Sequence, residues 1–401
     1  MPDERFKVLA ELAVHGANIQ PGQVVGVTTE LGQEELVREV AVAAYARGAI
    51  FVDAPYFDPW VKRERVLNAA PDTLDHVPQW LAARMATFGD RADATITLVG
   101  VVAPNALEGV DPALSGRDRL PWVKERGRVI SERLINWTIV PCPHPAWSQL
   151  VFPELPPDEA YERLWEQLWH VLRLDEPDPA AAWDERSDAL KRSAQLLTEQ
   201  RFDALELEGP GTELTIGLLP TSTWGGGGFV TRNGLPHLPN IPTEEVFTSP
   251  DPARTEGHVT ATKPLVLRDG TIVRGLRVHF AGGRAVEVEA DENAGAIKTQ
   301  VASDEGAARL GEVALVDRQG RIGPLGTVFY DTLLDENSAS HIAFGHGFAF
   351  AVADEDVSRV NDSGIHIDFM IGSPELEVTG VTPAGERVPV LRSGDWQLEQ
   401  R

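Results

Sequence analysis

The chain has one cysteine, Cys142, among its 401 residues. A single thiol excludes an intrachain disulfide and a zinc site built from several thiolates. No apolar run approaches the roughly 20 residues that a membrane-spanning helix needs. The first residues, MPDERFKVLAELAVHG, are charged and helical in pattern and lack the apolar core of a signal peptide. We therefore expect a cytoplasmic protein with no part in the membrane.

Positive charge is also scarce. The chain has 36 Lys and Arg against 61 Asp and Glu, a formal net charge of −25. Nucleic-acid binding depends on clustered basic residues that displace counterions, and binding to an anionic membrane surface has the same need. We expect neither partner, and most of the acidic charge is typical of a solubilising surface.

The common one-line signatures of enzymes are missing as well. The glycine run at 225–228 is not followed by Lys and Ser or Thr, so it is no phosphate-binding loop. The chain contains neither GxSxG nor a helical HExxH. Any catalytic site must therefore be assembled from dispersed residues.

The predicted secondary structure changes near residue 200. Before it, helical patterns such as ERFKVLAELAVHG alternate with short apolar strands such as QVVGVTT, which predicts an α/β domain with a mostly parallel sheet. After it, alternating runs flank glycine turns, which predicts hairpins, with one helical stretch at 304–310. We expect an N-terminal α/β domain over 1–200 and a β-rich (α+β) catalytic domain over 201–401.

Acids and histidines stand on several predicted strands of the second half. In IHIDF, His366 and Asp368 are two apart and therefore share a face, which suits a pair of metal ligands or an Asp that orients a structural histidine. Glu312 stands near the start of the strand LGEVALV, where it would bind a partner or reach water. Glu244 and Glu245 face opposite ways on an extended chain, and the pattern leaves open which points inward.

The segment DENSASHIAFGHGFAF holds another acid and histidine. Glu336 and His341 are five apart, about 140° around a straight helix, so they cannot share a helix face. Both reach one site only if the chain bends or is partly loop, which Gly345 and Gly347 further on would permit. The alternative is a solvated Glu336 and a His341 in the core.

Taken together, these residues favour a metal site. Four carboxylates and two imidazoles would match the charge of two divalent cations, and this donor set suits Zn, Co or Mn with one bridging carboxylate. Such a pair of ions is typical of hydrolases that activate a bridging hydroxide.

The chain resembles the aminopeptidase T family of metalloaminopeptidases, the M29 peptidases. The resemblance covers essentially the whole chain in order. Its most specific segments are PNIPTEEVFTSP, DEGAARLGEVALV, FYDTLLDENSASHIAFG and IHIDFMIGSPELEV. Earlier in the chain, INWTIVPCPHPAW, LELEGPGTELTIGL and STWGGGG fit as well.

This resemblance implies a metal-dependent aminopeptidase that releases N-terminal residues from peptides with a free N-terminus. It implies two divalent ions per chain, a bridging hydroxide as nucleophile, a cytoplasmic homodimer, and Glu312 as the bridging carboxylate. The metal ligands that it implies are Glu245, Glu312, Glu336, His341, His366 and Asp368.

Two features depart from the family. The family has a catalytic tyrosine seven residues after the first histidine ligand, where this chain has Phe348, and His346 is the candidate to replace the lost donor. The 25 positions from His341 to His366 form a short interval, so the loop between them is expected to be trimmed. We also expect Glu244 to bind the substrate's α-amine and Trp224 to wall the substrate pocket, although Trp224 beside glycines also fits simple packing.

Two other functions stay open. A mononuclear iron, ring-cleaving dioxygenase of related fold could use His341, His366 and Asp368, but it would leave three glutamates without a role. A metal-bound scaffold with weak or lost peptidase activity is suggested only by Phe348.

Overall fold

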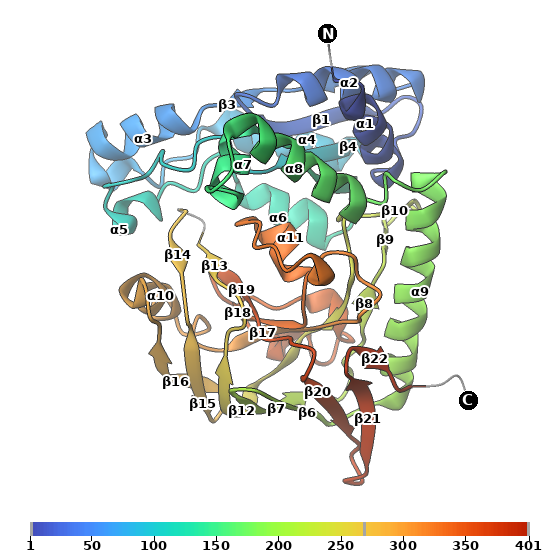
Figure 1. The fold of residues 1–401 in the computed structure, drawn as a ribbon, viewed down its shortest axis with the longest axis vertical. Helices are drawn as coiled ribbons and strands as arrows, with labels where there is room; N and C mark the ends of the chain where they lie inside the picture. Colours follow the sequence, from blue (N-terminus) through green and yellow to red (C-terminus); the bar gives the residue numbers. More distant parts are fainter. Residues whose placement is uncertain (1–2, 268–269, 399–401) are drawn as a thin grey trace. The chain divides into compact units, whose positions relative to one another are not determined.

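The computed structural model describes residues 3–267 and 270–398. The chain divides into two compact units, each built from separate stretches of sequence (Figure 1). Unit 1 comprises residues 3–185, Gly228–Pro242 and Gly270, and unit 2 comprises Arg186–Gly227, Thr243–Leu267 and 271–398.

Unit 1 is built around parallel strands in the order β2-β1-β4-β5, with β3 continuing the pairing along β1. Its strands are β1 (Val24–Glu30), β2 (Phe51–Asp53), β3 (Tyr56–Phe57), β4 (Ala94–Val99), β5 (Asn136–Pro141) and the antiparallel pair β9 (Phe229–Val230) and β10 (Pro236–His237). Its helices are α1 (Glu4–Gly16), α2 (Glu34–Ala46), α3 (Pro59–Asn68), η1 (Pro71–Thr73), α4 (Gln79–Arg91), α5 (Pro112–Ser115), α6 (Lys124–Ser131), α7 (Pro145–Val151) and α8 (Pro157–Val171).

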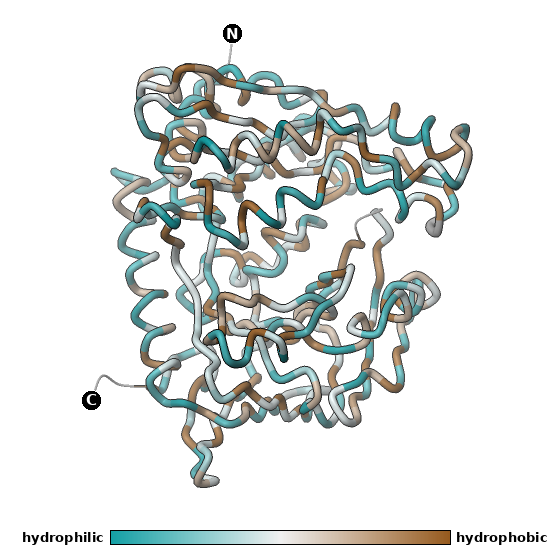
Figure 2. Tube along the Cα trace, turned by 180° about the vertical axis from the view of Figure 1, so that it is seen from behind, coloured by the Kyte–Doolittle hydropathy of each residue, from teal (hydrophilic) through white to brown (hydrophobic). Residues whose placement is uncertain are grey.

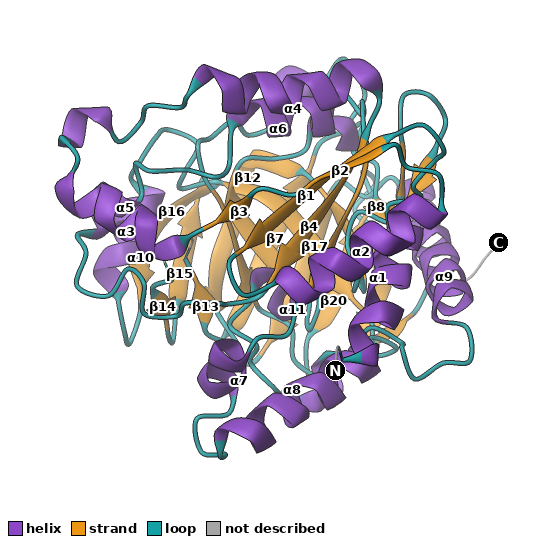
Figure 3. Cartoon of the chain, turned by 90° about the horizontal axis from the view of Figure 1, so that it is seen from above, coloured by secondary structure: helices purple, strands orange, loops and turns teal. Residues whose placement is uncertain are grey.

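Helices cover both faces of this parallel sheet. In Figure 3, α1 and α2 lie on one side of β1 and β4, and α4 and α6 lie on the other. Strand β4 is accordingly buried along almost its whole length, which is why it reads as a continuous apolar and threonine run. Gly26 in β1 allows α4 to approach closely, since a side chain there would lie 2.7 Å from the ring of Phe88.

The long helix α9 (Pro179–Gln200) carries the chain from unit 1 into unit 2. Hydrophilic and hydrophobic residues alternate along it (Figure 2). Its second half packs Leu190, Ala194 and Leu197 into the core of unit 2.

Two antiparallel sheets make up most of unit 2. The larger has the order β16-β15-β12-β7-β6-β20-β21-β22, and the smaller has the order β19-β18-β17-β11-β8. The larger sheet contains β6 (Ala204–Gly209), β7 (Thr212–Leu218), β12 (Pro250–Thr260), β15 (Arg277–Ala281), β16 (Arg284–Glu289), β20 (Glu377–Val381), β21 (Arg387–Arg392) and β22 (Asp395–Trp396). The smaller contains β8 (Gly225–Gly226), β11 (Glu245–Thr248), β17 (Leu310–Val316), β18 (His341–Gly345) and β19 (His366–Met370).

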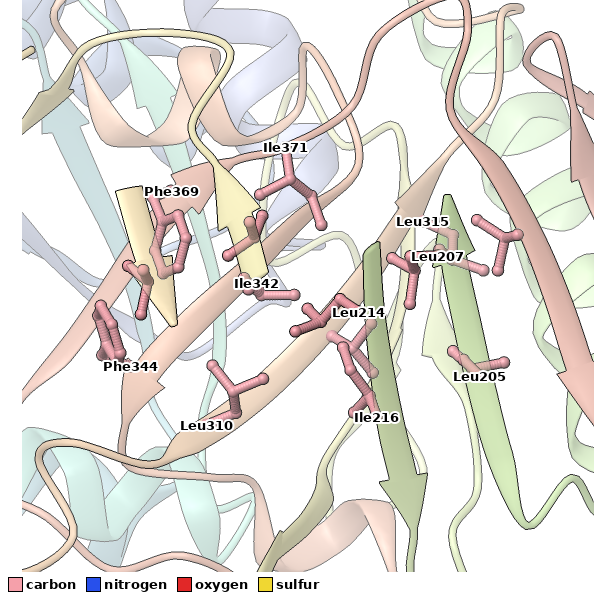
Figure 4. Packing of buried hydrophobic residues seen from close by; sticks show 14 of the residues in the cluster. Leu205, Leu207, Leu214, Ile216, Leu310, Leu315, Ile342, Phe344, Phe369 and Ile371 are labelled. Atoms are coloured by element: carbon pink, nitrogen blue, oxygen red, sulfur yellow. The ribbon is translucent and has the colours of Figure 1, made fainter. Parts of the chain in front are cut away.

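The apolar faces of these two sheets share one core. Leu205, Leu207, Leu214 and Ile216 come from the larger sheet, and they pack in one cluster with residues of the smaller sheet such as Ile342 (Figure 4). The rest of unit 2 consists of β13 (Leu265–Val266), β14 (Ile272–Val273), α10 (Ala294–Val301), η2 (Gly323–Leu325), α11 (Thr332–Glu336), η3 (Ala349–Ala351) and η4 (Val357–Arg359).

The expected α/β region with a parallel sheet and the strand-rich remainder are confirmed. The division at residue 200 stays a prediction, and so does the assignment of one domain to catalysis. None of the helices in the described part of the chain is long and apolar enough to cross a membrane.

The prediction of a helix at 304–310 is wrong. The helix of this region is α10, which ends at Val301, and residues 304–309 form turns instead. Asp304 accepts hydrogen bonds from Ser363 Oγ and the Gly364 amide, and Gly306 lies against the carbonyl of Asp362. These contacts with a distant loop outweigh the local helix propensity of the alanines.

Candidate metal centre

The polar face of the smaller sheet of unit 2 carries the candidate ligands. Across the sheet, Glu312 on β17 pairs with Ala343 on β18, and Ala343 pairs with Asp368 on β19. Residues paired across a sheet lie on the same face. The face that alternation predicted for His366 and Asp368 is therefore also the face of Glu312, and the strand pairing is what brings them together.

The opposite face of the same sheet is apolar. Val313 is completely buried in the core of unit 2. So are Ile342, Phe344 and Phe369, which Figure 4 labels. The strict alternation fixes the register, since a slip by one residue would move four core side chains to the polar face. The core packing thus holds the ligand-bearing face in place.

The register also selects between the two neighbouring glutamates. Strand β11 begins at Glu245, which pairs with Val316 on β17, on the same face as Glu312. Its neighbour Glu244 precedes the strand and turns toward α9, where its carboxylate accepts a hydrogen bond of 2.6 Å from Arg186 Nε. The structure thereby brings Glu245, and not Glu244, to the candidate ligands.

Two groups of three side chains converge on this face. Ligand atoms of Glu245, Glu312 and His341 all lie within 4.8 Å of one another, and so do those of Glu312, His366 and Asp368. Each group could hold a metal ion, and Glu312 is the residue that the two groups share.

Backbone carbonyls fix both imidazole rings. His366 Nδ1 lies 2.8 Å from the carbonyl oxygen of His346, and His341 Nδ1 lies 3.2 Å from that of Ala339. A carbonyl only accepts, so each Nδ1 carries the proton and donates it. The Nε2 lone pairs are then free to face the carboxylates, as in proteins where an outer partner orients a metal-binding histidine.

The Nε2 atoms meet carboxylate oxygens at short range. His341 Nε2 lies 3.1 Å from Glu245 Oε2, and His366 Nε2 lies 3.1 Å from Glu312 Oε2 and 3.2 Å from Asp368 Oδ1. Two lone pairs facing each other at this distance need a cation between them, either a proton or a metal ion. The nitrogen and oxygen donors of the five residues fit Zn, Co or Mn.

The electrostatics agree with a site built for cations. Burial alone would lower the pKa of His341, but Glu245 and the other carboxylates around it raise that pKa to about 10. Burial likewise opposes protonation of His366, and Asp368 with Glu312 raises its pKa well above the usual range. The carboxylates thus favour positive charge at both imidazoles, which is the kind of charge that a bound divalent ion would supply.

Glu336 stands slightly apart from the two groups. It is the last residue of α11, and the chain bends at 337–340 before β18 begins at His341. The expected bend therefore exists, but it lies before His341 and not at the later glycines. Burial, and then the nearby Asp368 and Glu245, raise the pKa of Glu336 well above its usual value. Its carboxyl group is thus within electrostatic range of the cluster, and its role as a ligand stays a prediction.

The residues predicted to act in catalysis or substrate binding differ in how deeply they are buried. Phe348 is half-buried, with its ring centroid 5.5 Å from that of His366. The side chain of His346 is 54% exposed and pairs with Asp362, while its carbonyl orients His366. Trp224 is buried in the core of unit 2, a position that favours packing. The substrate and catalytic roles expected for these residues stay predictions.

Glu244 is fully buried, and its ion pair favours a structural role over contact with a substrate amine. Arg186 joins it to Asp317, whose Oδ1 lies 2.9 Å from Arg186 Nη2. Trp396 Nε1 also donates to Asp317. Sequence analysis missed Arg186 and Asp317. Charged residues are common on amphipathic helices and at strand ends, where these two stand, so nothing in the local sequence predicts their ion pair.

The comparisons with known proteins fit this geometry. Residues 2–396 of the chain match the model of a protein family described as "Thermophilic metalloprotease (M29)". Aminopeptidase T of Thermus aquaticus is 42% identical over 405 residues, covering 98% of this chain and 99% of that protein. Aminopeptidase PepS of Streptococcus thermophilus is 35% identical over 408 residues, covering 98% of both chains. The solved structure titled "Wild-type AmpT from Thermus thermophilus" superimposes with a TM-score of 0.90 at 40% identity, covering 98% of this chain and 99% of that chain.

The fold and the site define a metal-dependent hydrolase. The chain belongs to the M29 family of thermophilic metalloproteases, as the resemblance in its sequence predicted. It is accordingly an enzyme of the class that hydrolyses peptide bonds.

Proposed function

We propose that this protein is a metal-dependent aminopeptidase that removes N-terminal residues from peptides with a free N-terminus. The observation that carries the proposal is the shared position of Glu312 between the two groups of ligand atoms. The curated relatives named as aminopeptidases, which align over almost the whole chain, support the same activity.

We assign the metal-binding role to the set predicted from the sequence, with Glu312 as the bridge between two ions. When bound, a pair of divalent cations would supply Lewis-acid activation of the peptide carbonyl and of the attacking water, including the bridging hydroxide expected from the sequence. The set is Glu245, Glu312, Glu336, His341, His366 and Asp368.

The protein's own side chains account for orientation and charge. The Nδ1 hydrogen bonds of His341 and His366 hold each ring in one tautomer, so that Nε2 points into the cluster. Acidic groups outnumber imidazoles in this set by four to two. This excess of acidic groups favours a cationic α-amine on the substrate, which gives a physical reason for cleavage at the N-terminal end of a peptide.

The iron dioxygenase is the second candidate, because His366 and Asp368 lie together in one ligand group. Glu245 and Glu312 speak against it. A two-histidine, one-carboxylate iron site would leave both glutamates as buried charges without a cation.

Metal analysis and a substrate panel test the proposal together. The purified protein, loaded in turn with Zn²⁺, Co²⁺ and Mn²⁺, should bind two ions per chain and hydrolyse aminoacyl-p-nitroanilides. N-acetylated versions of the same substrates are the matched control and should not be cleaved, because they lack the cationic amine. One iron per chain with oxygen-dependent ring cleavage would instead establish the dioxygenase.

The assembly and location remain proposals that rest on the family resemblance. We propose a homodimer in the cytoplasm, and light scattering on the eluted protein measures the mass of the assembly directly. A mass of about one chain, 43.7 kDa, would reject the dimer.

A further inference from the structure

Three phenylalanine rings gather beside the candidate metal centre. The ring centroids of Phe348 and Phe350 are 5.3 Å apart in a stacked arrangement, and Phe247 meets both edge-on at 5.3 and 6.3 Å. The ring of Phe348 in turn lies 5.5 Å from that of His366. We call Phe247, Phe348 and Phe350 the aromatic face.

The aromatic face lies on the same side of the sheet as the metal ligands. Phe247 on β11 is two residues from Glu245 and pairs with Ala314 on β17, which in turn pairs with His341. The ring contact with His366 makes the aromatic face continuous with the metal centre.

The backbone that carries the rings is held firmly. The amide of Phe348 donates to Ser249 Oγ at 2.7 Å, and the amide of Thr223 donates to the carbonyl of Ala351 at 2.8 Å. These bonds tie both ends of the segment 348–351 to other parts of unit 2. A subsite needs such support, because loosely held rings would adapt to any ligand.

Exposure of the rings calls for an explanation. Phe350 is 41% exposed, and within the described part of unit 2 it is the one aromatic side chain among the exposed large apolar residues. Phe348 is half-buried, while Phe247 behind them is buried. An apolar patch that stays open beside a reaction centre is typical of a ligand-binding surface.

We propose that the aromatic face is the subsite for the side chain of the substrate's N-terminal residue, and that this side chain is large and apolar. The inference rests on the proposed function, since it needs the scissile peptide bond at the metal centre. The side chain of the residue that supplies the scissile carbonyl starts one carbon away from the reacting atom, within reach of a ring that touches His366. Leucine and phenylalanine would cover the exposed rings, and a charged side chain would lose water without gaining a partner.

The test compares substrates that differ only in the N-terminal residue. Leucyl, phenylalanyl, alanyl, lysyl and glutamyl p-nitroanilides are assayed with the metal-loaded enzyme. We expect kcat/KM for the leucyl and phenylalanyl substrates to exceed that for the alanyl substrate by about tenfold or more, since hydrophobic pockets discriminate by this amount per one or two methylenes.

Variants then connect the preference to the rings. Phe350→Ala should reduce the leucyl-to-alanyl ratio of kcat/KM at least fivefold. Val286→Ala truncates another exposed apolar side chain of unit 2, on β16, and should leave the ratio unchanged. Circular dichroism and melting curves establish that each variant is folded.

The outcomes separate the two proposals. Hydrolysis of all five substrates without preference for leucine or phenylalanine overturns the subsite but leaves the aminopeptidase intact. Failure to cleave any substrate with any of the three metals overturns the proposed function itself. An equal loss of activity on every substrate in Phe350→Ala, or a preference that follows the second residue of dipeptides instead, also overturns the subsite.

Discussion

The amide of Glu244 donates a hydrogen bond of 2.7 Å to Asn337 Oδ1. Each partner is the chain neighbour of a candidate metal ligand, Glu245 in one case and Glu336 in the other. The bond is fully buried and joins segments that are 93 positions apart. It therefore fixes the spacing of two ligand-bearing segments that share no strand pairing with each other.

Asn337→Ala tests this link. The substitution leaves the Glu244 amide without its acceptor and removes the Asn337 side-chain bond to the Leu333 carbonyl. Loss of an outer partner of metal ligands weakens metal affinity by about 10–100-fold, and we expect this in competition titrations with a zinc chelator. Asn136→Ala removes a buried amide of unit 1 that donates to the Ala17 carbonyl, and it should change affinity much less. Equal affinities in both variants would show that the link does not position ligands.

Arg186→Met tests the buried ion pairs behind the site. Glu244 and Asp317 would lose the guanidinium that both contact, and breaking a buried pair on one side costs about 3–5 kcal/mol of unfolding free energy. Denaturant unfolding measures the loss. Lys191→Met on the same helix breaks an exposed pair with Asp188 and should cost about 0.5 kcal/mol or less. A similarly small cost for Arg186→Met would contradict the structural role.

Glu312→Gln tests the bridge. The amide keeps the shape of the side chain but loses the charge that both ligand groups share, so we expect hydrolysis to fall below detection and the metal content to fall below two ions per chain. Glu287→Gln neutralises an exposed carboxylate on β16 and should behave like the parent enzyme. Full activity in Glu312→Gln would reject a bridging carboxylate.

Phe348→Tyr tests what the family's missing hydroxyl contributes. A hydrogen-bond donor to a developing oxyanion is worth about 10²–10³ in kcat, so the added hydroxyl should raise kcat at least tenfold. His346→Ala is the companion variant, expected to lower kcat about tenfold if the imidazole supplies the donor now. An unchanged kcat in both variants would mean that neither position donates.

His237→Phe tests acid stability away from the site. Burial lowers the pKa of His237 to about 4 from a usual 6.5, so the folded protein holds a neutral ring that the unfolded chain would protonate. Because protons bind the unfolded chain more readily, the free energy of unfolding is at its full value above about pH 6.5. It then decreases as the pH falls toward 4, by about 3 kcal/mol in total. Unfolding at pH 7 and pH 5 should show a smaller acid loss in His237→Phe than in the parent, whereas His258→Phe at an exposed site should show the parental loss.

Much of the local structure follows from short-range pattern. The helix expected over ERFKVLAELAVHG is α1, and it begins after Asp3, whose side chain accepts from the Arg5 amide. Hairpins at glycine turns were predicted for the second half of the chain, and two of them turn at Gly211 and Gly283, where glycine adopts the positive φ that each turn needs. The helix predicted at 304–310 does not form, because contacts with a loop that is distant in sequence determine the conformation of this segment.

The sequence by itself determined which residues could act together on one strand. His366 and Asp368 share a face because side chains alternate every two residues, whatever else surrounds the strand. Long-range pairing decided what alternation cannot: that Glu312 lines up with Asp368, that Glu245 and not Glu244 faces the cluster, and that Arg186 from a distant helix neutralises the glutamate left over. Register and ion pairing depend on which strands and helices meet in the folded core, and that information is not contained in any short segment of the chain.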